Sequence, residues 1–445
     1  MAMPSHQARH ARDGRRGPRR RELLVGLAAG LVSLLRPRGV RGQARAEVRT
    51  ATPPPRYWIH VVMTGGLDAV WTTDPKTLAD VKAGVDVPYR PDQILTAGDL
   101  RLGPLFEPLL PVANRLTIVN GVLVRTANHY TGIEQCARLR TMTTMRTPAA
   151  FDIIGAHRDS QALASVTLNA SLRQAHTAGF FGTSAEGDFG GGASVLAEID
   201  SLDAEARHEL ARVLGDRARA LQRLGSPTPA RAVAIDNMQQ VAAFLARTAE
   251  LPAFELTPWL EGPFKGQDDV GGFVSDLQRA VWLIEHDLAA TLTVFAGNFF
   301  WDSHYRNSIS QSAITPVFAA ALERFFHALS SRSNRHGALD SQTGVILTTE
   351  LGRMPYLNAF NGKDHFPQSP VIVAAPGLVA GRQFGGTGKE MEALPISTRT
   401  GRVVTSGERL VLDDLGHTVL RRAGIDPARY GFPGRELAFL AKDAL

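Results

Sequence analysis

The chain has 445 residues, of which 44% are hydrophobic and 21% are charged, a composition typical of one large globular domain or two modest ones. Its sequence pI of about 9.7 would suggest nucleic acid or an anionic membrane as a partner if the basic charge were spread over the fold. Residues 1–46 hold 11 Lys and Arg against two Asp and Glu, which leaves 38 basic and 41 acidic side chains in the rest, so the charge gives no reason to expect a nucleic-acid-binding domain.

Residues 1–46 have the organisation of a secretory signal. Basic residues that include Arg19 to Arg21 precede an apolar run over residues 23–35, and the segment ends in Ala44-Arg45-Ala46. Paired arginines followed by x-Leu-Leu indicate the twin-arginine export machinery as a partner. A membrane anchor is the alternative, but a run of 13 residues is shorter than the ~20 that a transmembrane helix needs. We therefore expect a periplasmic or secreted protein with no stable transmembrane span, whether or not the signal is cleaved.

The remainder is interpreted as one domain, residues 56–440, behind a proline-rich linker of residues 47–55. Its single cysteine, Cys136, excludes an intramolecular disulfide and any multi-cysteine metal site, and is interpreted as a small buried residue. Residues 182–263 are rich in Ala, Arg and Glu with helical periodicity, which predicts a helical insertion that covers the sheet or its mouth. The glycine-rich start of this stretch, residues 187–192, lacks the spacing of a phosphate-binding loop and is interpreted as a flexible loop.

Five short apolar runs rich in Val, Ile and Thr predict buried strands. They cover residues 57–63, 115–124, 290–296, 344–349 and 370–375. Helical patterns lie between them and after them, at residues 131–139, 273–288, 316–329 and 410–422. The order of strands and helices predicts an α/β fold, a three-layer sandwich with a mostly parallel central sheet.

Polar clusters stand at the ends of several of these runs. They are Gly65-Gly66-Leu67-Asp68, Asn128-His129-Tyr130-Thr131, Asp302-Ser303-His304, and Glu350 followed by Asp364-His365. Ligands of open α/β sheets bind outside the carboxyl ends of the strands, so we expect these clusters to converge. Because carboxylates and imidazoles are ligands of divalent cations, the clusters predict a metal centre.

The two later clusters carry the strongest signal. Asp302 and His304 are two residues apart, and in an extended segment both side chains point the same way, as two ligands of one ion require. The alternative is a surface Asp and a capping His. Glu350 stands at the tip of an apolar strand, where a carboxylate is costly unless it is paired or bound to metal. A plain ion pair with Arg353 is the alternative, and the return of Asp364-His365 nearby favours the metal.

The two earlier clusters are less specific. Asp68 follows a tight glycine turn at a strand end and suits a further ligand. Thr131 opens a predicted helix, where a metal could make its hydroxyl a nucleophile, although Thr131 as a simple N-cap explains the sequence equally well. His129 is a ligand, a substrate contact or a packed residue.

The leader, the strand followed by GGLD, and the motifs NHYTG, WDSH, TELGR and GKDHF resemble the exported bacterial proteins of the domain-of-unknown-function family DUF1501, over roughly residues 56–435. That family resembles the alkaline phosphatase and sulfatase superfamily in fold. The resemblance implies a two-metal site for divalent cations, whether Zn, Mg, Mn or Ca. The predicted ligands are Asp68, Asp302, His304, Glu350, Asp364 and His365.

The resemblance also implies a reaction, the metal-dependent hydrolysis of a phosphate or sulfate ester of a small molecule or polymer. Two cations about 4 Å apart would assist attack by Thr131, and Arg353, or else Arg125, would clamp an oxyanion through its bidentate fork. Asn128 stands where many relatives carry Ser, so a catalytically inactive exported binding or assembly protein is the alternative. A third interpretation treats the His and Asp clusters as ordinary core packing.

Overall fold

The computed structural model describes residues 52–141, 148–158, 162–168, 199–267, 270–296 and 301–442. The predicted signal of residues 1–46, most of the predicted linker, and the glycine-rich loop of residues 187–192 lie outside these ranges. The central element is a seven-stranded sheet with the strand order β13-β4-β12-β9-β1-β6-β5, and it sets the position of every candidate site residue.

All five predicted strands are present. They are β1 (Tyr57–Met63), β4 (Thr117–Leu123), β6 (Ala289–Ala296), β9 (Thr343–Thr349) and β12 (Gln368–Ala374). The sheet has two further strands at its edges, β5 (Leu163–Leu168) and β13 (Arg382–Gly385). β1 lies near the middle between β6 and β9 and is buried along its whole length, as expected for a parallel strand that is covered on both faces.

The sheet is mostly parallel, as predicted, with one antiparallel strand. β12 runs antiparallel to both of its neighbours, β4 and β9, whereas the pairs β1–β6, β1–β9, β5–β6 and β4–β13 are parallel. The chain therefore enters β12 at the edge where the parallel strands end. Residues just before β12 and residues just after β1, β6 and β9 meet at that edge.

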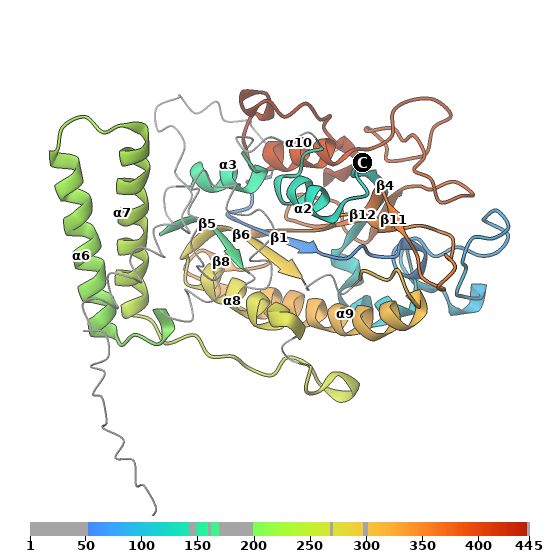
Figure 1. Cartoon of the computed structure of the whole chain (residues 1–445), viewed down its shortest axis with the longest axis horizontal. Coiled ribbons are helices and arrows are strands. Elements are labelled where there is room, and N and C mark those ends of the chain that lie inside the picture. The colour runs from blue at the N-terminus through green and yellow to red at the C-terminus, as the bar shows by residue number, and fades with distance from the viewer. Residues whose placement is uncertain are drawn as a thin grey trace, which may run out of the picture.

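Helices cover both faces of the sheet and make a three-layer sandwich (Figure 1). One face carries α2 (His129–Arg138), α3 (Ala150–Ala156) and α10 (Leu412–Arg422). The other carries α8 (Phe273–Glu285), α9 (Asn307–Ser331) and the 3-10 segment η3 (Pro104–Arg115). Because side chains alternate along a strand, Trp58 and Val62 of β1 join the first core, while Ile59 and Val61 join the second.

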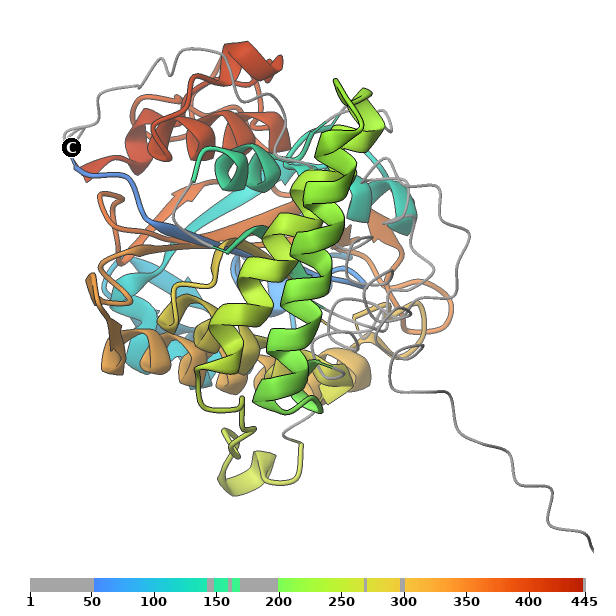
Figure 2. The ribbon, with the colours of Figure 1, turned by 90° about the vertical axis from the view of Figure 1, so that its left-hand side faces the viewer.

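The predicted helical insertion contains two long helices in its described part, α6 (Ala204–Arg223) and α7 (Pro229–Ala249). They pack side by side (Figure 2), and α7 lies next to β5 (Figure 1). The side chain of Gln240 on α7 accepts a hydrogen bond of 3.3 Å from the backbone of Ala164 on β5. These helices therefore cover the β5 edge of the sheet. Among the described helices, none combines the length and apolar character that a membrane crossing needs.

The remaining elements are short. The strand pairs are β2 (Leu95–Ala97) with β3 (Leu100–Leu102), β7 (Ser333–Asn334) with β8 (Gly337–Ala338), and β10 (Gly352–Arg353) with β11 (His365–Phe366). The short 3-10 turns are η1 (Ala69–Trp71), η2 (Pro91–Gln93), η4 (Gly262–Phe264), η5 (Val270–Gly272), η6 (Pro427–Tyr430) and η7 (Ala438–Leu440). The β10–β11 pair matters most for function, because it lies in the connection between β9 and β12.

Candidate metal centre

Glycines let the segments at this edge of the sheet approach one another closely. Gly65 follows β1 with a φ of +112°, and a Cβ there would lie 2.5 Å from the backbone nitrogen of Asp302. Gly132 faces the end of β9, where a Cβ would lie 2.4 Å from the carbonyl oxygen of Glu350. Since real Cβ contacts are never so short, side chains at these two positions would push the functional segments apart.

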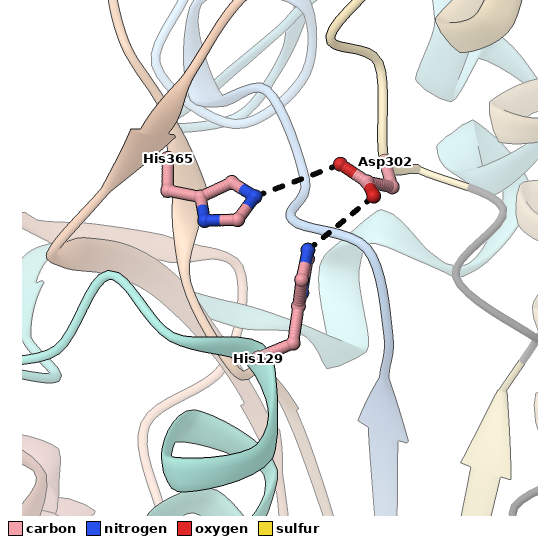
Figure 3. A group of neighbouring side chains, drawn as sticks. All are labelled: His129, Asp302 and His365. Carbon is pink, nitrogen blue, oxygen red and sulfur yellow. Dashed lines mark ion pairs between the residues drawn. The ribbon is translucent and has the colours of Figure 1, made fainter.

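Three side chains from three segments converge at this point. His129 begins α2, Asp302 follows β6, and His365 precedes β12, and Figure 3 shows the three groups turned toward one another. One ligand atom from each lies within 4.8 Å of the others. The Oδ2 of Asp302 is 3.4 Å from Nε2 of His129, and its Oδ1 is 3.6 Å from Nε2 of His365.

His304 extends this group to four side chains. Its Nε2 lies 3.3 Å from Oδ1 of Asp302 and 2.8 Å from Nε2 of His365. We refer to His129, Asp302, His304 and His365 as the His-Asp cluster. Three of its members were predicted metal ligands, and His129 was one of the open possibilities.

Each imidazole of the His-Asp cluster has an acceptor behind it. The Nδ1 atoms lie 2.8 Å from Oε1 of Glu350 for His129, 2.9 Å from Oδ1 of Asp364 for His304, and 2.6 Å from the carbonyl oxygen of Ala127 for His365. Such an acceptor fixes the tautomer with a proton on Nδ1 and leaves Nε2 to bind a metal. The structure therefore places Glu350 and Asp364, both predicted ligands, behind the rings.

Glu350 is fully buried and has several donors around it. Besides His129, its Oε1 accepts a hydrogen bond of 2.5 Å from the backbone of Gly65, and its Oε2 accepts one of 3.2 Å from the hydroxyl of Thr349. Burial lowers the pKa of His129, but the hydrogen bonds to Asp302 and Glu350 outweigh it and raise that pKa to about 9. In the absence of metal, the protonated ring compensates the buried carboxylate.

Arg353 holds Asp302 in place. Its Nη2 lies 2.8 Å from Oδ1 of Asp302, and the guanidinium also donates to the carbonyl oxygens of Gly65, Gly66 and Lys363. Burial by itself raises the pKa of Asp302. The hydrogen bonds from His129 and His365 and the charge of Arg353 outweigh burial, so the pKa of Asp302 is lowered overall. Arg353 is itself buried, so the contacts described here are those of a positioning group, and its predicted role as an oxyanion clamp stays a prediction.

Asp68 belongs to a different group of contacts. Its Oδ2 lies 2.7 Å from Nζ of Lys363 and accepts a hydrogen bond of 2.9 Å from the amide of Asn307, and its Oδ1 accepts one of 3.2 Å from the backbone of Val70. The predicted ligand thus already has a cation of the protein beside it.

Thr131 is the third residue of α2 and is exposed to solvent. The N-cap of the helix is Asn128, whose side chain accepts a hydrogen bond of 3.0 Å from the backbone of Thr131. The alternative of Thr131 as N-cap is therefore wrong. Residues two apart on a helix do not face each other, so helix geometry turns Thr131 away from the side on which His129 meets the cluster.

Some groups that complete the site could not be predicted from the sequence. Lys363 resembles a surface residue in the sequence, yet it is fully buried. The carbonyl of Ala127 cannot be recognised from a residue type at all. His129 had a usable signal, since it follows a predicted strand and opens a predicted helix as closely as Thr131 does.

The His-Asp cluster fits a metal ion in both chemistry and size. Three imidazole nitrogens and one carboxylate are typical ligands of zinc. Neighbouring ligand atoms of a tetrahedral site with bonds of 2.0–2.1 Å are about 3.3 Å apart, and four of the separations between donor atoms of the cluster run from 2.8 to 3.6 Å. Donor atoms of His129, Asp302 and His365 all lie within 4.8 Å of one another, which is close enough for the three side chains to share an ion.

A family model described as "Protein of unknown function (DUF1501)" matches residues 56–440 of the chain. Among solved structures, a mutant of TAB5 alkaline phosphatase with Mg bound has a TM-score of 0.39 and 9% sequence identity, over 84% of this chain and 99% of that chain. The alkaline phosphatase of the Antarctic bacterium TAB5 has a TM-score of 0.38 and 11% identity, over 84% and 100%. The PsFucS1 sulfatase from Pseudoalteromonas sp. has a TM-score of 0.37 and 12% identity, over 95% and 76%. The comparison with curated proteins gave no match.

Proposed function

We propose that this chain, which belongs to the DUF1501 family of proteins of unknown function over residues 56–440, is an exported metal-dependent hydrolase of phosphate or sulfate esters. The observation that carries the metal is the separation of 2.8 Å between Nε2 of His304 and Nε2 of His365. Because the Nδ1 of each ring faces an acceptor, both Nε2 atoms present lone pairs to each other when the rings are neutral. A shared cation removes that repulsion.

The donor set favours zinc or a related first-row metal. Imidazole suits Zn, Cu, Fe and Ni, whereas Mg and Ca prefer sites made of oxygen atoms alone. A bound ion of this kind supplies Lewis-acid polarisation of an ester oxygen and a water molecule of lowered pKa. A proton shared between His304 and His365 is the alternative explanation of their separation, and metal analysis distinguishes the two.

The His-Asp cluster is partly exposed to solvent. The side chains of Asp302 and His304 are 31% and 36% exposed, while the groups behind them, Glu350 and Arg353, are buried. Metal sites that perform catalysis keep one position open for water or substrate. An ester oxygen can therefore approach from the solvent side, while Glu350 and Arg353 hold the ligands from the protein side.

The substrate class and the cellular location come from the sequence. The order of the GGLD, WDSH, TELGR and GKDHF motifs resembles that of exported relatives of the phosphatase and sulfatase superfamily, which favours a phosphate or sulfate ester. The leader of residues 1–46 favours transfer by the twin-arginine machinery to the periplasm or beyond.

A second candidate is an exported binding protein that holds the metal without turnover. The exposed position of Thr131 favours it, because the predicted nucleophile lies two residues from His129 on α2 and so does not face the same side of the helix. If the protein is an enzyme, a water molecule can take the place of Thr131 as the group that attacks the ester.

Metal analysis tests the proposal first. We expect purified wild-type protein to retain zinc or a related metal after dialysis, and His129→Ala and His365→Ala to lose it. His208→Ala, which changes an exposed histidine on α6, serves as the matched control and should keep the metal. Full metal content in both cluster variants, or none in the wild type, contradicts the metal centre.

Turnover then separates the two candidate functions. The metal-loaded protein is incubated with aryl phosphates, phosphodiesters and aryl sulfates, with His365→Ala and metal-free protein as blanks. Hydrolysis that depends on metal and on His365 supports the enzyme. Tight metal binding with no turnover of any ester supports the binding protein.

A further inference from the structure

We infer that the centre holds one metal ion, because the ammonium group of Lys363 occupies the place beside Asp68 that a second cation would take. The inference rests on the proposed function, since it concerns the metal content of the same site. It departs from the two-metal arrangement that the sequence resemblance implies.

The contacts of Asp68 are those of a carboxylate whose charge is already compensated. Its Oδ2 has Nζ of Lys363 at 2.7 Å and the amide of Asn307 at 2.9 Å, and its Oδ1 has the backbone nitrogen of Val70 at 3.2 Å. Asp68, Lys363 and Asn307 are all fully buried. Both carboxylate oxygens of Asp68 therefore already have donors beside them. Because these side chains are fully buried, a hydrated metal ion cannot reach Asp68 from solvent.

Lys363 is held in this position by more than one partner. Its Nζ also lies 3.1 Å from Oδ2 of Asp86, which accepts a further hydrogen bond of 3.1 Å from the indole of Trp71. Its backbone nitrogen donates to the carbonyl of Ser303 at 2.9 Å, and its own carbonyl accepts from Arg353 at 3.0 Å. Lysine is almost never fully buried unless it is paired, so the ammonium is part of the fold.

These contacts exclude a second cation for an electrostatic reason. A divalent ion bound by Asp68 would lie within a few ångströms of the Lys363 ammonium, and two positive charges in a buried, low-dielectric place repel strongly. Glu350 offers no second place either, because its oxygens accept from Gly65, His129 and Thr349. Of the predicted ligands, Asp302, His304 and His365 remain, joined by His129, and the donor atoms of His129, Asp302 and His365 lie close enough together to hold one ion.

Lys363 is also a positioning residue for the His-Asp cluster. It lies two residues before His365 in the chain, and its backbone bonds to Ser303 beside Asp302 and His304. The ion pair with Asp68 therefore fixes the connection between β9 and β12 against the end of β1.

Metal stoichiometry gives the direct test. We expect native mass spectrometry and elemental analysis of zinc-loaded wild-type protein to show one ion per chain. Asp68→Asn should keep that ion with an affinity within about threefold of wild type, whereas His365→Ala should lose more than a hundredfold. Two ions per chain, with one lost in Asp68→Asn, would overturn the inference and leave the proposed hydrolase intact, whereas no ion at all would overturn both.

A second test uses metal-free protein and stays informative if Asp68→Asn folds poorly. The denaturant midpoints of wild type, Asp68→Asn, Lys363→Met and the double variant form a thermodynamic cycle. We expect each single change to lower the midpoint and the double variant to be more stable than the two losses added together, because it removes both charges of the Asp68–Lys363 pair. If Asp68 is instead a metal ligand that repels its neighbours without metal, Asp68→Asn raises the midpoint of the metal-free protein, and the inference is wrong.

Discussion

Oε1 of Glu350 lies 2.8 Å from Nδ1 of His129, although the carboxylate stands at the end of β9 and the imidazole at the start of α2. The contact explains why a buried acid is tolerated at the tip of an apolar strand. It also changes the predicted role of Glu350, which contacts the His-Asp cluster through the ring of His129. A carboxylate in this place orients the imidazole and makes it a better ligand.

Glu350→Gln tests that role. The change keeps the size of the side chain and removes its charge, so His129 should retain its place but lose basicity. We expect the affinity for zinc to fall on the order of 10- to 100-fold, measured by competition with a chromophoric chelator. Glu205→Gln on the exposed part of α6 is the control and should leave the affinity unchanged. An unchanged zinc affinity in Glu350→Gln would show that Glu350 does not affect the strength of His129 as a ligand.

The stability of the metal-free protein should depend on pH through His129. Its pKa is raised from 6.5 to about 9 in the folded protein, so the protonated ring contributes stability that is fully present below pH 6.5 and is lost as the pH rises through about 9. The denaturant midpoint of chelator-treated protein should therefore fall between pH 7 and pH 9.5. His129→Gln should flatten that decline. Asp302, whose pKa is lowered, affects stability only in acid and does not confuse the measurement.

Gly65 should tolerate no side chain. Its φ of +112° and the distance of 2.5 Å from a Cβ to the nitrogen of Asp302 combine backbone strain with a clash against backbone. We expect Gly65→Ala to lower the free energy of unfolding by on the order of 3 kcal/mol and to weaken metal binding. Gly225→Ala is a matched control, because Gly225 also has a positive φ, of +85°, but open space around it. Gly225→Ala should lower the free energy of unfolding by about 1 kcal/mol. Equal losses in the two variants would show that close packing at Gly65 is unimportant.

Thr131→Ala identifies the attacking group. Thr131 is exposed and two residues from His129 on α2, so we expect the variant to keep its metal and, if the protein is a hydrolase, to keep turnover within about threefold. That result assigns the attack to water. A loss of more than a hundredfold at full metal content would instead make Thr131 the nucleophile that the sequence resemblance implies.

The strands were predictable because burial imposes a composition. β1, β4, β6, β9 and β12 are continuous apolar runs, and each was recognised from that pattern. β13 was missed because its Arg-Gln-Phe-Gly sequence is polar, as is common at a sheet edge. β5 was also missed, although its six residues are mostly apolar and buried. The direction of β12 could not be predicted either, because a strand that is buried on both faces has the same apolar pattern whichever way it runs.

The candidate site was predictable to the extent that residue type determines chemistry. Asp302, His304 and His365 were expected together and lie together. Asp68 and Glu350 have the same chemistry in the sequence, but their environment differs. One pairs with Lys363 and the other with His129, and such long-range pairings depend on how distant segments cross, which one sequence does not specify.

The antiparallel direction of β12 has a mechanical consequence. The connection from Glu350 to Pro367 leaves one strand and enters its immediate neighbour, so it is anchored at both ends to the same hydrogen-bonded ladder. It carries Arg353, Lys363 and His365, and a slip of one residue between β9 and β12 would displace all three together. Under the proposed function, metal affinity therefore depends on the register between β9 and β12, and a variant that disturbs this ladder far from the His-Asp cluster should first show a loss of metal.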